Sequence, residues 1–217
     1  MDTTVYLKIY DAPLVNKKEI LRYMGAKKED DELLKIIDDS LKEALDKLTY
    51  KVCYITIPVD EDGYINLGNG KVKSEKLSAN LKGSCMAILF GATIGIEIDR
   101  LIAKYGKISP IKALAFQAIG AERIEALCDA FSSDIKGEYN IKPRFSPGYG
   151  DFDISYQKEI FNLLKPERKI GLTLNESLVM TPSKSVTAVM GLTKEDSFKH
   201  IPCEKCSKKD CEFRRMK

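Results

Sequence analysis

The chain has 217 residues, of which 44% are hydrophobic and 31% are charged, the balance of a globular protein. Its 35 Lys and Arg nearly match its 32 Asp and Glu, so the formal charge of +3 gives no reason to expect nucleic acid or a membrane as a partner. No apolar run approaches the roughly 18 residues of a membrane span, and the N-terminus lacks the features of a signal peptide, so we expect a cytoplasmic protein.

Hydrophobic periodicity predicts strands and helices in a mixed order. The predicted elements are a strand at 5–9, helices at 17–24 and 30–48, a strand at 50–59, a turn at 60–63 returning as a strand at 64–67, a strand at 84–90, helices at 96–105, 110–133 and 156–164, and strands at 169–174 and 185–192. The hairpin pieces favour an α+β fold with helices packed on a mainly antiparallel sheet. We expect residues 1–195 to form this domain and residues 196–217 to form a separate Cys-rich tail.

The turn between the apolar strand and the next helix, Gly91 to Gly95, could expose backbone N–H groups to an anion. It lacks the Lys-Ser/Thr of a P-loop and the third glycine of a dinucleotide fingerprint. We therefore prefer to interpret Thr93 as a helix cap and the glycines as positions of close packing.

On the long helix, two acids flank an apolar stripe. The stripe consists of Ile124, Leu127, Cys128, Phe131 and Ile135. Glu125 and Asp129 lie four residues apart at its edge, so both can point toward a cleft on one face of the helix. The alternative is that both are ordinary solvated acids.

The loop around Arg144 carries the most chemical information in the chain. Pro147 fixes its own φ and Gly148 can adopt a positive φ, which predicts a tight turn. Arg144 offers a planar fork of donors suited to a carboxylate or phosphate, and Glu138 can accept from an ammonium or a hydroxyl. Tyr149 adds a flat face and a hydroxyl. These groups could hold a zwitterionic ligand with an aromatic part, or they could form an ordinary surface turn with a salt bridge.

The six cysteines form two groups. Those inside apolar segments, which we expect in the core, are Cys53, Cys85 and Cys128. Those near the C-terminus form a C-x2-C pair with a third cysteine, and the single histidine lies beside them; these residues are Cys203, Cys206, Cys211 and His200. Four such ligands would suit zinc, and three cysteines with an open position would suit an iron–sulfur cluster. A tail with incidental thiols is the alternative.

Residues 144–149, which read RFSPGY, together with Glu138 six residues earlier, resemble the S-adenosylmethionine-binding loop of the activation domain of cobalamin-dependent methionine synthase. Three further stretches agree with that domain in order and spacing between about residues 85 and 191: a strand and Thr-Gly turn at 89–95, a Leu-x-Glu-Ser segment with Met-x-Pro at 174–182, and a Ser-Val strand at 184–187. After Tyr149 the family loop continues with Pro and a small residue, whereas this chain has Gly-Asp-Phe at 150–152.

The resemblance implies a role in the reductive methylation of an inactivated corrinoid. Cob(II)alamin must gain an electron and a methyl group together, with S-adenosylmethionine as the methyl donor. No Asp-x-His-x-x-Gly cobalamin motif is present. The cobalamin is therefore expected on a partner, either a methionine synthase lacking this domain or another corrinoid protein. A flavoprotein or ferredoxin would supply the electron.

The resemblance also assigns roles to individual residues. Arg144 would clamp the methionyl carboxylate, and Glu125 and Glu138 would bind the amino group or ribose. The loop backbone from Ser146 through Gly148 to Tyr149 would hold the adenosyl part. Asp129 could replace Glu125 if the helix register is shifted by one turn. Two other functions stay open: a non-catalytic regulatory or metal-binding module, and a stand-alone methyltransferase acting on another substrate.

Overall fold

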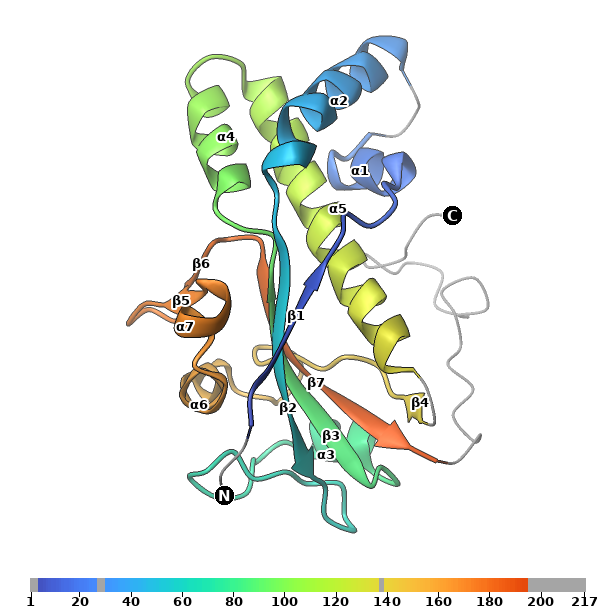
Figure 1. Ribbon diagram of the computed structural model, residues 1–217, viewed down its shortest axis with the longest axis vertical. Coiled ribbons are helices and arrows are strands. Elements are labelled where there is room, and N and C mark those ends of the chain that lie inside the picture. Colours follow the sequence, from blue (N-terminus) through green and yellow to red (C-terminus); the bar gives the residue numbers. More distant parts are fainter. Residues whose placement is uncertain (1–3, 27–29, 137–138, 195–217) are drawn as a thin grey trace.

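The computed structural model describes residues 4–26, 30–136 and 139–194, and within them a five-stranded sheet forms the middle layer (Figure 1). Its strand order is β1-β2-β3-β7-β4, and every neighbouring pair is antiparallel. The strands are β1 (Tyr6–Tyr10), β2 (Tyr50–Pro58), β3 (Met86–Thr93), β7 (Ser185–Thr193) and β4 (Asn140–Ile141). The predicted α+β class with a mainly antiparallel sheet is therefore confirmed.

Helices cover both faces of this sheet. On one face lie α1 (Lys17–Tyr23), α2 (Asp31–Ala44), which continues as the 3-10 turn η1 (Leu45–Lys47), α4 (Glu97–Gly106) and α5 (Pro110–Ile135). On the other face lie α3 (Glu75–Leu81), α6 (Gln157–Leu164), which follows the 3-10 turn η2 (Ile154–Tyr156), and α7 (Pro166–Ile170). A two-stranded arm, β5 (Thr173–Leu174) with β6 (Met180–Thr181), follows α7.

The strands alternate their side chains between two cores, as a pleated strand requires. In β2, Val52 packs under α1, α2, α4 and α5, while Cys53 and Ile55 pack under α3, α6 and α7. In β3, Ile88 and Leu89 divide in the same way. Because the central strands are buried on both faces, they read in the sequence as nearly continuous apolar runs.

The long helix α5 crosses the sheet and organises the first core (Figure 1). Ser109 takes the cap position and Pro110 the first turn, where a missing N–H costs nothing. The predicted inward stripe is confirmed, because four of its five members are buried and Ile135 is half-buried.

The predicted strand at 64–67 is wrong. Both edges of β2 are already occupied, by β1 on one side and β3 on the other, so no returning strand can pair with it. The segment instead folds on itself: Asp60 accepts from the N–H groups of Asp62 and Tyr64, and Val72 N donates to Ile65 O.

The predicted strand at 169–174 is also wrong over most of its length. Pro166 begins the short helix α7, and Gly171 ends it with a positive φ of 72°, so only Thr173–Leu174 remain extended. The sequence reading also missed α3, which begins at the N-cap Ser74, whose Oγ accepts from Leu77 N.

Thr93 and Cys85 do not take their expected places. Thr93 ends β3, where its Oγ1 accepts from Gly95 N at 3.2 Å, whereas α4 begins with Glu97 and has no side-chain cap. A Cβ added to Gly95 would stand 2.6 Å from Thr49 Oγ1, so close packing does hold for that glycine. Cys53 and Cys128 are buried as expected, but Cys85 precedes β3 and is exposed.

None of the helices in the described ranges combines the length and the apolar character that a membrane crossing requires.

Candidate functional site

A cleft of about 400 Å³ lies between α5 and the N-terminal segment that leads into α1. It is lined by Pro13, Leu14, Asn16, Glu19, Tyr23, Glu122, Glu125, Ala126, Asp129, Ala130 and Ser133. Four of these residues are acids, and the others are small, apolar or neutral polar. A cleft of this character suits a small ligand with polar groups and some apolar surface.

One wall of the cleft is a single face of α5. The residues concerned recur at intervals of three and four, which brings them to one side of the helix. Glu125 and Asp129, predicted to share a cleft, both line it. Burial raises the pKa of Tyr23 on the opposite wall, and the charge of Glu125 raises it further.

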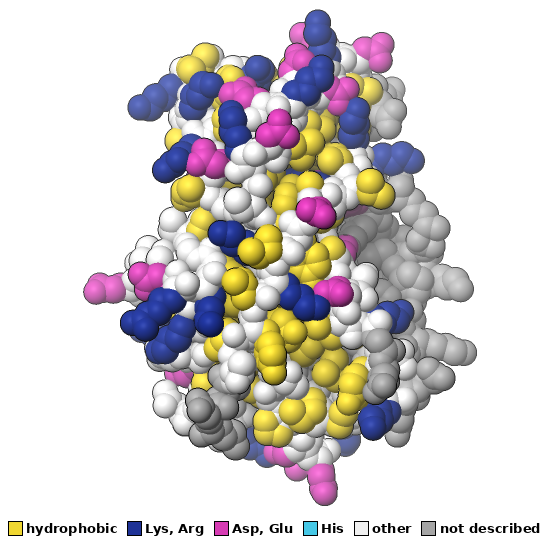
Figure 2. Space-filling model, in the orientation of Figure 1, with side chains coloured by type: hydrophobic (Ala, Val, Ile, Leu, Met, Phe, Trp, Pro, Cys, Tyr) yellow, Lys and Arg dark blue, Asp and Glu magenta, His cyan; other side chains and the backbone are white. Residues whose placement is uncertain are grey.

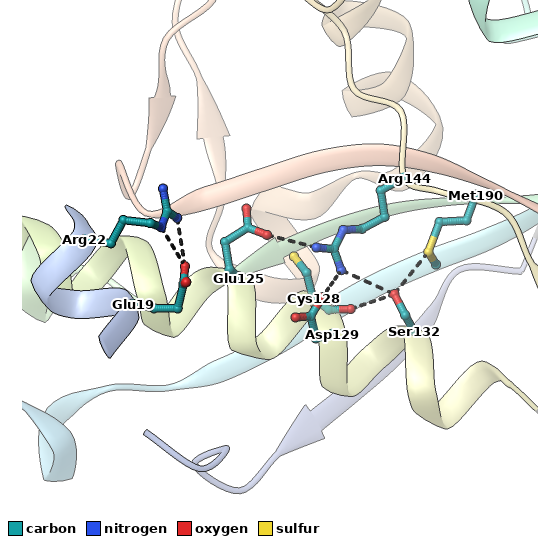
Figure 3. A network of polar contacts seen from close by, with 8 residues as sticks. All are labelled: Glu19, Arg22, Glu125, Cys128, Asp129, Ser132, Arg144 and Met190. Carbon is teal, nitrogen blue, oxygen red and sulfur yellow. Dashed lines mark hydrogen bonds and ion pairs between the residues drawn. The ribbon is translucent and has the colours of Figure 1, made fainter. Parts of the chain in front are cut away.

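The opposite wall is joined to α5 by hydrogen bonds. Asn16 caps α1, because its Oδ1 accepts from Glu19 N at 3.2 Å. Its own backbone N donates to Glu122 Oε1 at 2.9 Å. Glu19 in turn accepts from Arg22 at 2.8 Å (Figure 3).

A buried ion pair fixes the same wall more firmly. The Arg123 guanidinium donates to Glu122 from Nε and Nη2, each at 2.5 Å. It also donates to the carbonyl oxygens of Pro13 at 2.5 Å and Leu14 at 2.7 Å. Arg123 is 0% exposed and Glu122 is 4% exposed. The backbone of residues 13–16 is therefore held against α5 by hydrogen bonds to a buried ion pair.

Arg144 reaches α5 from the other side and joins the two predicted acids (Figure 3). Its Nη2 donates to Glu125 Oε2 at 2.9 Å, and its Nη1 donates to Asp129 Oδ1 at 2.8 Å and to Ser132 Oγ at 3.4 Å. Burial alone would lower the pKa of Arg144, but the negative groups beside it raise that pKa, so the guanidinium stays charged.

The turn that follows Arg144 is built on the opposite face of the sheet. Tyr149 N donates to Ser146 O, and Gly148 has φ 91°, which is the predicted Pro-Gly turn. Phe152 packs in the core between the sheet and α3, α6 and α7. Asp151 accepts from Ser74 Oγ at 2.6 Å and from the first backbone N–H groups of α3. The Gly-Asp-Phe departure from the family loop therefore anchors this turn to α3.

The structure thus brings together some of the predicted site residues and not others. Glu125, Asp129 and Arg144 meet at the edge of the cleft. Ser146, Gly148 and Tyr149 follow Arg144 in the chain but do not line the cleft. Glu138 lies outside the described residues, as do the candidate metal ligands Cys203, Cys206, Cys211 and His200. Within the described ranges, no three His, Cys, Asp or Glu side chains gather as a metal site would need.

The sequence reading missed the wall formed by residues 13–16 and the buried pair that holds it. One signal was present: Arg123 stands four residues after Ile119 and four before Leu127, on the apolar stripe itself. A charge at such a position must be paired when it is buried. No local pattern indicated that its partners would come from a segment more than 100 residues away.

A second and larger groove, of about 700 Å³, lies between α6 and α7. Lys158, Lys165 and Arg168 line it, and Lys and Arg side chains gather over these helices in Figure 2. It contains none of the predicted site residues, so we take the cleft at α5, despite its smaller volume, as the candidate site.

Two comparisons with known proteins bear on this site. The family model described as "Vitamin B12 dependent methionine synthase, activation domain" matches residues 84–215. A solved structure described as "Crystal Structure of the MetH Reactivation Domain bound to AdoHcy" is similar with a TM-score of 0.66 and 14% sequence identity, over 90% of this chain and 80% of that chain. At this identity the likeness supports the fold alone. A comparison with curated proteins finds no match.

Proposed function

Because the chain belongs to the family of the vitamin B12-dependent methionine synthase activation domain, we propose that it binds S-adenosylmethionine and supports the reductive methylation of a cobalamin held by a partner protein. One observation carries the proposal within the structure. Arg144, from the loop that resembles the family's ligand loop, meets Glu125 and Asp129 at the edge of an acid-lined cleft.

The charges of the cleft fit this ligand. S-adenosylmethionine carries a sulfonium and an ammonium, both positive, and one carboxylate. Glu125 and Asp129 offer negative charge along the cleft and are shared with Arg144 at its edge, whereas Glu19 is paired with Arg22. The volume of about 400 Å³ lies within the usual range for small-molecule sites.

Arg144 would bind the carboxylate by exchanging one of its present partners for it. A guanidinium has five N–H donors in a fixed fork, so it can keep one acid of α5 and accept a ligand carboxylate beside it. The acid displaced from Arg144 would then face the ligand's ammonium. This exchange assigns Glu125 or Asp129 to the amino group and Arg144 to the carboxylate.

In the proposed reaction the ligand supplies its methyl group to reduced cobalt and leaves as S-adenosylhomocysteine, with one electron from an external donor. Cobalt is itself the nucleophile, so the chain needs no general base, and the cleft offers binding groups only. The contribution of Arg144, Glu125 and Asp129 is to fix the ligand's methionyl end, and therefore the direction in which its methyl group points.

The finer parts of the proposal concern partners and the tail. We assign the cobalamin to a methionine synthase lacking this domain or to another corrinoid protein, and the electron to a flavoprotein or ferredoxin. We also propose residues 196–217 as a unit separate from the domain, in which Cys203, Cys206, Cys211 and His200 bind zinc or an iron–sulfur cluster.

The test is anaerobic and follows the cobalt spectrum. A cobalamin-binding module of methionine synthase in the cob(II)alamin state is mixed with S-adenosylmethionine and titanium(III) citrate, with and without the chain. Methylcobalamin should form much faster when the chain is present. Methylation of another acceptor with no corrinoid in the mixture would support a stand-alone methyltransferase instead. Binding of neither ligand nor corrinoid module would favour a regulatory role.

A further inference from the structure

We infer that Ser132 is a positioning residue for Arg144: its hydroxyl holds the Nη1 end of the guanidinium while Arg144 exchanges an acid of α5 for the carboxylate of the ligand. The inference rests on the proposed function, because it concerns the step in which that ligand takes its place on Arg144. Ser132 carries no charge and is not among the residues that line the cleft, so its role would be exerted through Arg144 rather than on the ligand.

The main chain on both sides of Arg144 is fixed to β7. Lys142 N donates to Gly191 O at 2.9 Å. Phe145 and Val189 each donate to the carbonyl oxygen of the other, again at 2.9 Å. The backbone of Arg144 therefore has a defined position relative to the sheet. Its side chain is long and has many rotamers, so the direction of the guanidinium is decided by the acceptors at its end.

These acceptors differ in whether a ligand could displace them (Figure 3). Glu125 and Asp129 are carboxylates whose side chains are 37% and 49% exposed, so either can leave Arg144 and be solvated. Either can also be drawn toward the ammonium of the ligand. Ser132 is neutral and half-buried, so an incoming zwitterion neither competes for it nor attracts it strongly. It is therefore the acceptor that stays with Arg144 during the exchange.

The hydroxyl of Ser132 is itself held in one orientation. Its Oγ donates to Cys128 O, one turn earlier on α5, at 2.8 Å. A hydroxyl has one hydrogen and two lone pairs, so with its hydrogen on that carbonyl it can act toward Arg144 only as an acceptor. Met190 Sδ of β7 lies 3.4 Å from the same oxygen and limits its movement from the side of the sheet.

The three contacts of Arg144 divide between its two terminal nitrogens. Nη2 donates to Glu125, whereas Nη1 donates to Asp129 at 2.8 Å and to Ser132 at 3.4 Å. Whichever acid is exchanged, Nη1 keeps Ser132. The contact is long, so it contributes little while Asp129 occupies the same nitrogen, and its effect appears when the acids rearrange. A guanidinium already held in direction loses less freedom when it binds the carboxylate, which favours binding.

The experiment measures S-adenosylmethionine affinity by calorimetry in Ser132→Ala, Ser132→Thr and a matched control, Ser40→Ala. Ser40 is a buried serine on α2 whose Oγ has no hydrogen-bond partner among the described residues. Ser132→Ala is also made in the Arg144→Ala background, which completes a double-mutant cycle. Thermal unfolding of each variant separates effects on binding from effects on the fold.

Ser132→Ala should weaken S-adenosylmethionine binding by about threefold to tenfold, the factor that one net hydrogen bond contributes. Ser132→Thr should retain most of the affinity, because a threonine hydroxyl in a helix can make the same bond to the preceding turn. Ser40→Ala should match the parent. The melting temperature of Ser132→Ala should not fall, since alanine is the better helix former and a serine bonded to the preceding turn slightly destabilises a helix.

In the Arg144→Ala background, Ser132→Ala should have no further effect on affinity, because the group that it positions is gone. Equal affinities of Ser132→Ala and the parent overturn the inference and leave the proposed function intact. Equal losses with and without Arg144 also overturn it, since Ser132 would then act on the fold rather than through Arg144. A parent chain that does not bind S-adenosylmethionine overturns the proposed function, and this inference with it.

Discussion

Replacing Arg123 by methionine should destabilise the fold by about 3–5 kcal/mol, because removing one partner of a buried ion pair leaves an uncompensated charge. Here the remaining charge would be Glu122, which is 4% exposed, and two backbone carbonyls would also lose their donor. For a chain of this length each kcal/mol lowers the melting temperature by about 2–4 °C, so the expected drop is roughly 6–20 °C.

The assay is urea unfolding followed by circular dichroism, with linear extrapolation to water. Arg100→Met is the matched control, because Arg100 forms an exposed pair with Glu97 on α4 that should contribute less than about 1 kcal/mol. The double variant Glu122→Gln/Arg123→Met should recover part of the loss, since it leaves no buried charge behind. If Arg123→Met costs no more than Arg100→Met, or if the double variant is no more stable than Arg123→Met, the pair does not hold the wall as described.

Three further predictions concern the ligand, the loop and the tail. Arg144→Ala should weaken S-adenosylmethionine binding by about 1.5–3 kcal/mol, the range for a charge-assisted hydrogen bond, while Arg168→Ala on α7 should not; equal affinities in calorimetry would remove Arg144 from the site. Hydrogen bonds from Ser74 and from the backbone of Lys76 and Glu75 lower the pKa of Asp151 in the folded state. The parent should therefore be more stable than Asp151→Asn above the unfolded pKa of about 3.9. This difference in stability should be lost as the pH falls through the lower folded pKa. Urea midpoints from pH 7 to pH 3 test this, and a pH-independent difference would contradict it. Metal analysis of anaerobically purified protein should find about one zinc or one cluster per chain, and an unchanged content in Cys203→Ser/Cys206→Ser would exclude these ligands.

Elements whose partners are implied by their own sequence pattern could be predicted. The buried strands and the stripe of α5 follow from periodicity, and the Pro147-Gly148 turn follows from the backbone preferences of those two residues. The segment 64–67 has the composition of a strand, but it cannot pair with β2 because β1 and β3 occupy both edges of β2. That competition is a property of the whole sheet, and no local window contains it.

The candidate site, like the fold, could be predicted only where the contacts of a residue are local in the sequence. The spacing of Glu125 and Asp129 placed both acids on one helix face, and both do line the cleft. The opposite wall comes from residues 13–16, which reach α5 only through contacts across more than 100 residues of chain. In the sequence, the only indication of those contacts was the charge of Arg123 within an apolar stripe. That charge predicts a buried partner but does not predict which segment supplies it.

Burial separates the roles of the two arginines that meet α5. Arg123 is fully buried, and exchanging any of its partners for a ligand would leave Glu122 or a carbonyl unpaired away from water, so its contacts are suited to holding a wall. Arg144 is 20% exposed, and its partners Glu125 and Asp129 are 37% and 49% exposed. Acids that reach water in this way can be solvated when they leave Arg144, so exchanging them costs less than breaking a fully buried pair. An incoming carboxylate can therefore replace an acid at Arg144 while Arg123 keeps the opposite wall fixed. One side of the site can then change its partners while the other stays rigid, as an ordered but reversible binding site requires.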